Sequence, residues 1–106
     1  MLSTSTQMLK GVLDGCLLAI IAKGETYGYE MIEKLQSHQL AVVSEGSIYP
    51  ALMRLQKNNL VSTVMRKSPS GPKRKYYSIT EEGMEELARF KELWEGLSEG
   101  VTSILA

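Results

Sequence analysis

A short central stretch of the chain gathers cations and holds no carboxylate. Residues 61–79 contain the basic residues Arg66, Lys67, Lys73, Arg74 and Lys75. Ammonium and guanidinium groups clustered in this way can neutralise phosphates and release the counterions that condense on a nucleic acid. Basic side chains on a sheet edge can also serve only to prevent aggregation. That role does not require nineteen residues without an acid, so the stretch favours contact with DNA.

A second stretch, residues 44–59, has the pattern of a helix that could enter the major groove. Its apolar stripe recurs at helical spacing and consists of Ile48, Leu52 and Leu55. The other side carries Arg54 and Lys57, which could meet phosphates. Ser47 and Tyr49 lie near its start, the end that recognition helices present to DNA. A short amphipathic core helix has the same pattern, so this stretch alone leaves both interpretations open.

Pro50 constrains where this helix begins. Proline lacks an amide hydrogen and is tolerated in the first turn, where that hydrogen would be unpaired. Ser44 and Ser47 are both suitable N-caps, since a serine hydroxyl accepts a hydrogen bond from an amide one turn on. A start at Ser47 places Pro50 in the first turn, so we expect Ser47 to be the cap. Asn58 and Asn59 are expected to end the helix.

Two further helices are predicted before this stretch. Apolar periodicity predicts one continuous helix over residues 8–23. Its glycines Gly11 and Gly15 lie one turn apart and predict close approach of another helix, which would compensate their low helix propensity. A second helix is expected over residues 27–37, with Thr26 as its N-cap.

The basic stretch itself is predicted to form a β-hairpin. Alternating strands at residues 60–67 and 74–79 flank a turn rich in proline, serine and glycine at residues 68–72. The turn is flanked by the cations Lys67, Lys73, Arg74 and Lys75. A last helix is expected to begin at the N-cap Thr80 and to continue to about Leu105.

This last helix carries a heptad seam. Its apolar residues are spaced alternately three and four apart, and they are Leu87, Phe90, Trp94, Leu97, Val101 and Ile104. Such a seam is typical of a helix that packs along another helix. A domain of this size cannot cover the whole seam, so we expect a second copy of the chain to cover it, giving a homodimer.

Composition narrows the remaining possibilities. Twelve basic and twelve acidic residues cancel, so only their distribution is informative. Cys16 is the only cysteine, which excludes an intrachain disulfide and suggests a core residue. His38 is expected on the surface at a helix C-terminus. The longest apolar run is too short to span a bilayer, and a cytoplasmic protein is expected. Paired carboxylates, a metal-ligand cluster and a phosphate-binding loop are lacking, so we expect neither an enzyme nor a cofactor.

The order of elements predicts a mostly helical fold with a small β-hairpin. Three helices followed by a basic hairpin and a terminal helix form a winged helix-turn-helix. Residues 1–79 would be the DNA-binding domain and residues 80–106 the dimerisation helix, together in one compact unit. Double-stranded DNA and a second copy are the expected partners. A winged helix used for protein–protein assembly, without specific DNA binding, is the alternative.

Three segments in this order resemble the PadR family of bacterial transcriptional regulators. They are YGYEMIEKL at residues 27–35, EGSIYPALMRLQKNNLV at residues 45–61 and SGPKRKYYSITEEG at residues 70–83. The resemblance covers about residues 8–90. It implies a homodimeric winged-helix repressor that binds a roughly palindromic operator, with modulation by a small molecule in many members.

The resemblance also assigns positions that would face DNA. In helix three they are Ser47, Tyr49 and Pro50, and on the wing they are Ser70, Gly71, Lys73 and Arg74. Trp94 resembles a tryptophan that stacks on flat aromatic effectors in some members, although it could instead be only an apolar anchor of the dimer. Gly96 and Gly100 depart from the family pattern and would permit either close helix approach or an open space.

Overall fold

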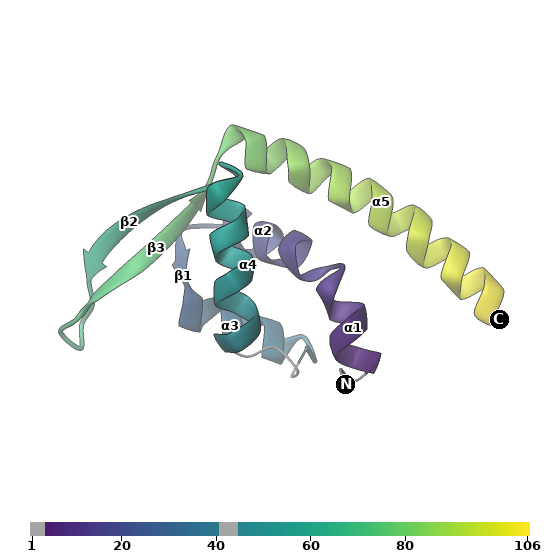
Figure 1. Ribbon diagram of the computed structural model, residues 1–106, viewed down its shortest axis with the longest axis horizontal. Coiled ribbons are helices and arrows are strands. Elements are labelled where there is room, and N and C mark those ends of the chain that lie inside the picture. The colour runs from purple at the N-terminus through teal and green to yellow at the C-terminus, as the bar shows by residue number, and fades with distance from the viewer. Residues whose placement is uncertain (1–3, 41–44) are drawn as a thin grey trace.

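The computed structural model describes residues 4–40 and 45–106. In this part of the chain the elements are α1 (Thr4–Lys10), α2 (Leu13–Ala22), β1 (Thr26–Tyr27), α3 (Gly28–Ser37), α4 (Glu45–Lys57), β2 (Val61–Lys67), β3 (Lys73–Ile79) and α5 (Glu81–Leu105). The molecule is elongated, with extents of 51 × 31 × 23 Å. In Figure 1 the β2–β3 hairpin projects from one side of the helices and the end of α5 projects from the other.

The predicted first helix is broken into two. α1 ends at Lys10 and α2 begins at Leu13, and the amide of Val12 donates to the carbonyl of Leu9 across the turn. The prediction of one continuous helix was therefore wrong. Of the two glycines, Gly15 has the ring of Phe90 directly against it, whereas Gly11 has no such neighbour. Gly11 thus contributes to the break, since it weakens the helix and gains no packing in return.

The sheet has three antiparallel strands, in the order β1–β3–β2, and not the two predicted. The short β1 pairs Thr26 with Tyr77 and Tyr27 with Tyr76. Thr26 is therefore a buried strand residue and not the cap of α3. Its hydroxyl donates to a carboxylate oxygen of Glu30, in the first turn of α3, at 2.5 Å. This bond ties the strand to the helix that follows it.

α4 begins at Glu45, two residues before the predicted cap. Ser47 therefore lies inside the helix and is not its N-cap, and Ser44 lies outside the described residues. Pro50 falls beyond the first turn, where it removes the amide that would bond the carbonyl of Gly46. Both residues are exposed, so water can satisfy that carbonyl. Pro50 is therefore tolerated at this exposed position, whereas at a buried position the carbonyl would lack a hydrogen-bond partner.

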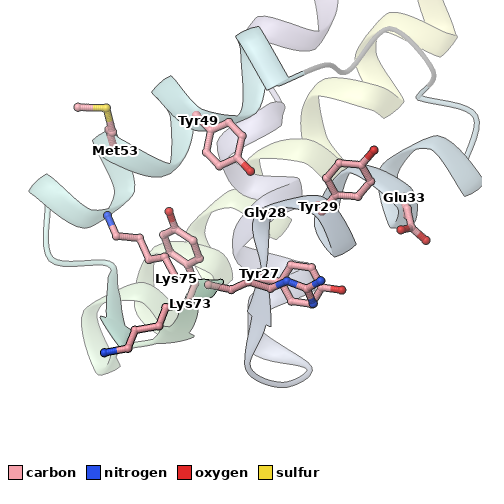
Figure 2. A pocket seen from close by; sticks show the side chains of 10 residues that line it. Tyr27, Gly28, Tyr29, Glu33, Tyr49, Met53, Lys73 and Lys75 are labelled. Atoms are coloured by element: carbon pink, nitrogen blue, oxygen red, sulfur yellow. The ribbon is translucent and has the colours of Figure 1, made fainter. Parts of the chain in front are cut away.

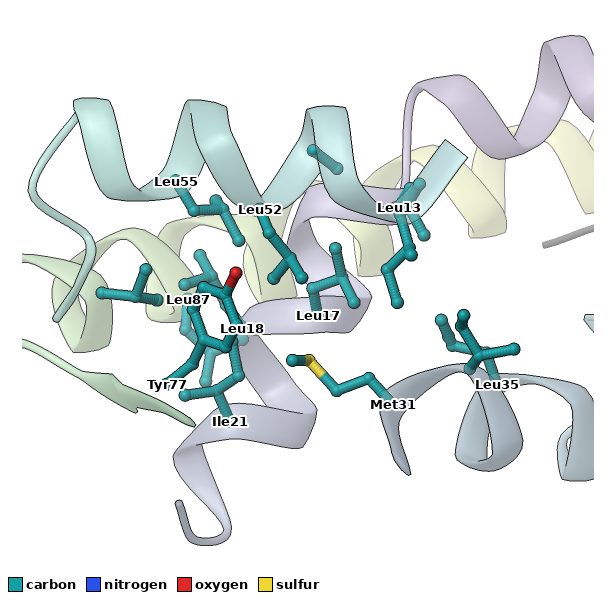
Figure 3. Close-up of a cluster of buried hydrophobic side chains, with 14 of the residues drawn as sticks. Leu13, Leu17, Leu18, Ile21, Met31, Leu35, Leu52, Leu55, Tyr77 and Leu87 are labelled. Carbon is teal, nitrogen blue, oxygen red and sulfur yellow. The ribbon is translucent and has the colours of Figure 1, made fainter. Parts of the chain in front are cut away.

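One hydrophobic core holds the helices, β3 and the start of α5 together. Its largest fully buried side chains are Leu17, Leu18, Ile21, Met31, Ile48, Leu52, Leu55 and Val61. Figure 3 shows side chains from α2, α3, α4, β3 and α5 meeting in this cluster. Cys16 packs against the core as predicted, and burial raises the pKa of its thiol. The predicted stripe of α4 is confirmed, because Ile48, Leu52 and Leu55 are all buried.

The start of α5 is fixed to the base of the hairpin. Thr80 is the N-cap as predicted, since its hydroxyl accepts from the amide of Gly83 at 3.0 Å. The same hydroxyl donates to the carbonyl of Asn59 at 2.7 Å. Asn59 ends α4 in a left-handed conformation, with φ of 60°. Gly83 lies so close to the carbonyl of Leu60 that a side chain would not fit. None of the described helices is long and apolar enough to cross a membrane.

Candidate nucleic-acid interface

The wing formed by β2 and β3 carries like charges directly across from one another. In its register Lys67 faces Lys73 and Arg66 faces Arg74. Opposed like charges destabilise a sheet, and a wing selected for stability alone would avoid them. The three lysines of the wing, Lys67 included, form no ion pair among the described residues. Their arrangement therefore suits an external polyanion.

Two arginines near this surface are each paired with a carboxylate. The guanidinium of Arg66 donates to both carboxylate oxygens of Glu25, at 3.0 to 3.2 Å. Arg54 pairs with Asp14 of α2 at 2.9 Å. These hydrogen bonds raise the pKa of each arginine. Arg54 was predicted to contact DNA, but its carboxylate partner holds it against α2, so we leave it out of the proposed contacts.

Arg74 has a different partner. Its guanidinium carbon lies 4.5 Å from the centre of the Tyr27 ring, and one nitrogen is 3.4 Å from the hydroxyl of Ser70. Among the described residues no carboxylate bonds to it. The ring of Tyr27 also meets that of Tyr76 edge to face, with centroids 5.3 Å apart. The positive charge of Arg74 is thus held in place without being neutralised.

A cavity of about 710 Å³ lies between the start of α3, the outer side of α4 and β3. It is lined by Tyr27, Gly28, Tyr29, Glu33, Tyr49, Met53, Lys73, Arg74, Lys75 and Tyr77. Figure 2 shows Tyr49 and Met53 of α4 on one side and Lys73 and Lys75 of β3 nearby. Three cations and one carboxylate line it, so the cavity favours an anion. The cavity joins the outer face of α4 to the wing.

Tyr49 and Met53 lie one turn apart on α4 and share this outer face. Met53 is 70% exposed, so its side chain is open to solvent on this face. The ring of Tyr49 rests over Gly28, where an added Cβ would lie 2.7 Å from its hydroxyl. Burial raises the pKa of Tyr77, with a smaller contribution from Tyr49. The absence of a side chain at Gly28 thus decides where Tyr49 points.

The structure brings together only some of the predicted DNA contacts. Tyr49, Lys73 and Arg74 line the cavity. The other predicted positions are not among its lining residues; they are half-buried or exposed and consist of Ser47, Pro50, Lys57, Lys67, Ser70 and Gly71. Gly71 has φ of +113°, which explains a glycine in the wing turn.

Sequence reasoning missed several residues of this surface. Tyr27, Tyr29 and Met53 line the cavity, although the sequence predicted no DNA contact for any of them. Met53 could have been found, because it lies off the apolar stripe of its helix. Tyr27 gave no such signal, since its position depends on the pairing of β1 with β3. His38 is exposed at the end of α3, as predicted, and a ring nitrogen lies 2.8 Å from the carbonyl of Lys34.

The first residues of the heptad seam of α5 pack against the protomer's own core, and the remaining residues are exposed to solvent. Leu87 is 4% exposed and belongs to the protomer's own core, so its prediction as an interface residue was wrong. Phe90 is half-buried against Gly15 of α2. The rest of the stripe is exposed and consists of Trp94, Leu97, Val101 and Ile104. Gly96 and Gly100 have nothing within 4 Å of an added Cβ. The uncovered stripe thus continues directly from the core.

Comparison with known proteins agrees with this geometry. Residues 17–89 match the transcriptional regulator PadR-like family. A PadR-like transcriptional regulator from Bacillus cereus is 52% identical and superposes with a TM-score of 0.84, over 93% of this chain and 96% of that one. A Streptococcus transcriptional regulator is 43% identical, with a TM-score of 0.83 over 94% and 98% of the two chains. A PadR family regulator from Clostridium difficile is 29% identical, with a TM-score of 0.79 over 90% and 99%. This chain therefore belongs to the PadR-like family of DNA-binding transcriptional regulators, which are not enzymes.

Proposed function

We propose that the protein is a homodimeric repressor that binds a roughly palindromic operator. The observation that carries the proposal is the single concave surface shared by α4 and the wing, where Tyr49 and Met53 adjoin Lys73, Arg74 and Lys75. A major groove about 12 Å wide admits a helix. With α4 in that groove, the cations of β3 would meet the phosphates beside it. Repression is supported by the resemblance of the chain to the family.

The exposed stripe of α5 supports a dimer. Trp94, Leu97, Val101 and Ile104 follow Leu87 and Phe90 on one side of the helix, so an apolar face that begins in the core continues into solvent. An exposed patch of this kind marks an interface. A two-fold pair would present two copies of α4, which read two half-sites of a palindrome together.

Trp94 supports a response to a small planar aromatic molecule. It is the only tryptophan of the chain and remains 48% exposed in the protomer, near the start of the exposed stripe. In a dimer it would lie at the interface, where a flat ligand could stack on it. Quenching of its fluorescence by planar aromatic compounds, with saturation, would support this part of the proposal. A linear, non-saturating quench would leave Trp94 only as an anchor.

Selection of bound sequences from random duplexes, followed by gel-shift titration at several salt concentrations, tests the function. A repressor of this kind should enrich an inverted repeat and bind it with an affinity that falls steeply as salt rises. Enrichment of a single half-site would contradict the dimer. Absence of any salt-dependent binding would contradict the DNA interface and favour a protein–protein assembly module. Repeating the selection with aromatic compounds tests the effector.

A further inference from the structure

We propose that Tyr27 is a positioning residue for DNA binding, and that its ring holds the guanidinium of Arg74 ready to bind a phosphodiester oxygen. The inference rests on the proposed DNA-binding function and deepens it. Tyr27 belongs to β1, which is not part of the wing hairpin or of α4. The wing would then depend on a residue nearly fifty positions away in the sequence for its most directional contact.

Arg74 differs from the other arginines of the chain in its partners. The chain has four arginines, and Arg54, Arg66 and Arg89 each bond a carboxylate. In the described part of the chain, Arg74 instead has an aromatic ring and one serine hydroxyl as its partners. A ring that covers one face of a guanidinium leaves its N–H groups, which lie in the plane, free to donate. Those donors match the oxygens of a phosphate, and the ring does not cancel the charge.

Tyr27 is itself held in place by its neighbours in the sheet. Its backbone pairs with Tyr76 in the sheet and forms the N-cap position of α3. Its ring meets the ring of Tyr76 at an interplanar angle of 62°. Because its backbone is fixed by the sheet and by α3 and its ring packs against that of Tyr76, the Tyr27 side chain offers a fixed surface to Arg74. An arginine ordered before binding loses less conformational freedom when it contacts DNA, and affinity rises accordingly.

The position of Arg74 on β3 separates it from the neighbouring lysines. Successive side chains of a strand point to opposite faces, so Lys73 and Lys75 lie on one face of β3 and Arg74 on the other. All three still line the same cavity, and they belong to the part of β3 that extends past its pairing with β1. Only Arg74 lies against Tyr27. Tyr27 should therefore affect the contact of Arg74 and leave those of the lysines unchanged.

The test is a double-mutant cycle measured with the full chain. Tyr27→Leu removes the ring, Tyr27→Phe keeps the ring and removes only the hydroxyl, and Arg74→Ala removes the guanidinium. Affinities for the selected duplex and for a random duplex are measured against salt, and thermal melting of each variant is recorded. Wild-type binding, measured first, tests the proposed function separately: a wild-type chain that binds no duplex refutes that function and, with it, this inference.

With wild-type binding established, Tyr27→Leu should weaken binding to both duplexes by about three- to tenfold per subunit, the range for ordering one long side chain. Tyr27→Phe should bind like the wild type. Arg74→Ala should flatten the slope of log affinity against log salt by about one unit per subunit. In the Arg74→Ala background, Tyr27→Leu should have no further effect.

An equal loss from Tyr27→Leu with and without Arg74 would overturn the inference, because it would show that Tyr27 acts only through the structure of the sheet. A loss on Tyr27→Phe would assign the effect to the hydroxyl and would overturn it as well. If Tyr27→Leu lowers the melting temperature so far that binding cannot be measured, Arg74→Lys replaces it. That variant keeps the charge but not the planar group, so weaker binding would support the inference and unchanged affinity would overturn it.

Discussion

Replacing Trp94 by alanine should dissociate the proposed dimer while leaving each protomer folded. Trp94 lies on the part of α5 that extends beyond the core, and it is not among the residues of the core cluster. Its removal should therefore change association far more than the melting temperature of a monomeric protomer. Leu87, on the same stripe, would behave in the opposite way, since it is buried in the core.

The magnitude follows from the exposure of the side chain. A large aromatic side chain buries roughly 150–250 Å². With 48% of Trp94 exposed, about 100 Å² per protomer remains for a partner to cover. At about 25 cal/mol per Å², this area contributes about 2.5 kcal/mol, or about 5 kcal/mol for two symmetric copies. Since about 1.4 kcal/mol corresponds to a factor of ten, the dimer dissociation constant should rise by a few thousandfold.

Sedimentation velocity from nanomolar to high micromolar concentration measures this constant. Glu92→Ala is the matched control, because Glu92 is an exposed residue two positions before Trp94 on the opposite side of α5. The control should dissociate like the wild type, whereas Trp94→Ala should become monomeric at concentrations where the wild type is dimeric. A wild-type chain that is monomeric at high micromolar concentration, or a Trp94→Ala chain that associates as tightly as the control, would refute the interface.

Three other outcomes are expected. Gly28→Ala should displace the ring of Tyr49, whose hydroxyl would lie 2.7 Å from the new methyl group. Affinity for the selected duplex should then fall about tenfold, within the range for one base contact, with little change in the melting temperature. An equal loss on random duplexes would contradict a role of Tyr49 in sequence preference. Alanine at both Lys67 and Lys73, which face each other on the wing, should leave the melting temperature unchanged or higher because a like-charge pair is removed. The same variant should bind all duplexes more weakly and flatten the salt slope by about two units per subunit, and an unchanged slope would place the wing tip off the DNA. A chain that ends at Leu93 keeps the part of α5 packed on α2, so it should fold as a monomer that has lost operator binding. Sedimentation and gel shift check this, and a truncated chain that still forms dimers would contradict it.

Features that depend only on residues close together in the chain could be predicted from the sequence. Apolar periodicity predicted the buried stripe of α4, and the turn residues predicted the hairpin. Thr80 was identifiable as a cap and Asn59 as a helix end, because each acts on amides or on backbone angles within one turn. The resemblance to the family likewise depended on short contiguous segments. Part of the candidate site could therefore be predicted from the sequence, because Tyr49 and the cations Lys73, Arg74 and Lys75 lie within those segments.

The tertiary structure decided which of these side chains are free to act. Arg54 meets Asp14, 40 positions away, and Arg66 meets Glu25, 41 positions away, so each guanidinium has a carboxylate partner that no local pattern indicated. The same packing placed Leu87 in the core and left the rest of its stripe in solvent.

The third strand was also decided by tertiary contact. A two-residue strand is too short to show periodicity, and Tyr27 gains its position only by pairing with β3. Gly11 and Gly15 are alike in sequence, but only Gly15 has the ring of Phe90 against it, and the helix breaks at the other. In each case the deciding contact joins residues far apart along the chain, and no local pattern records which of the possible distant partners will be met.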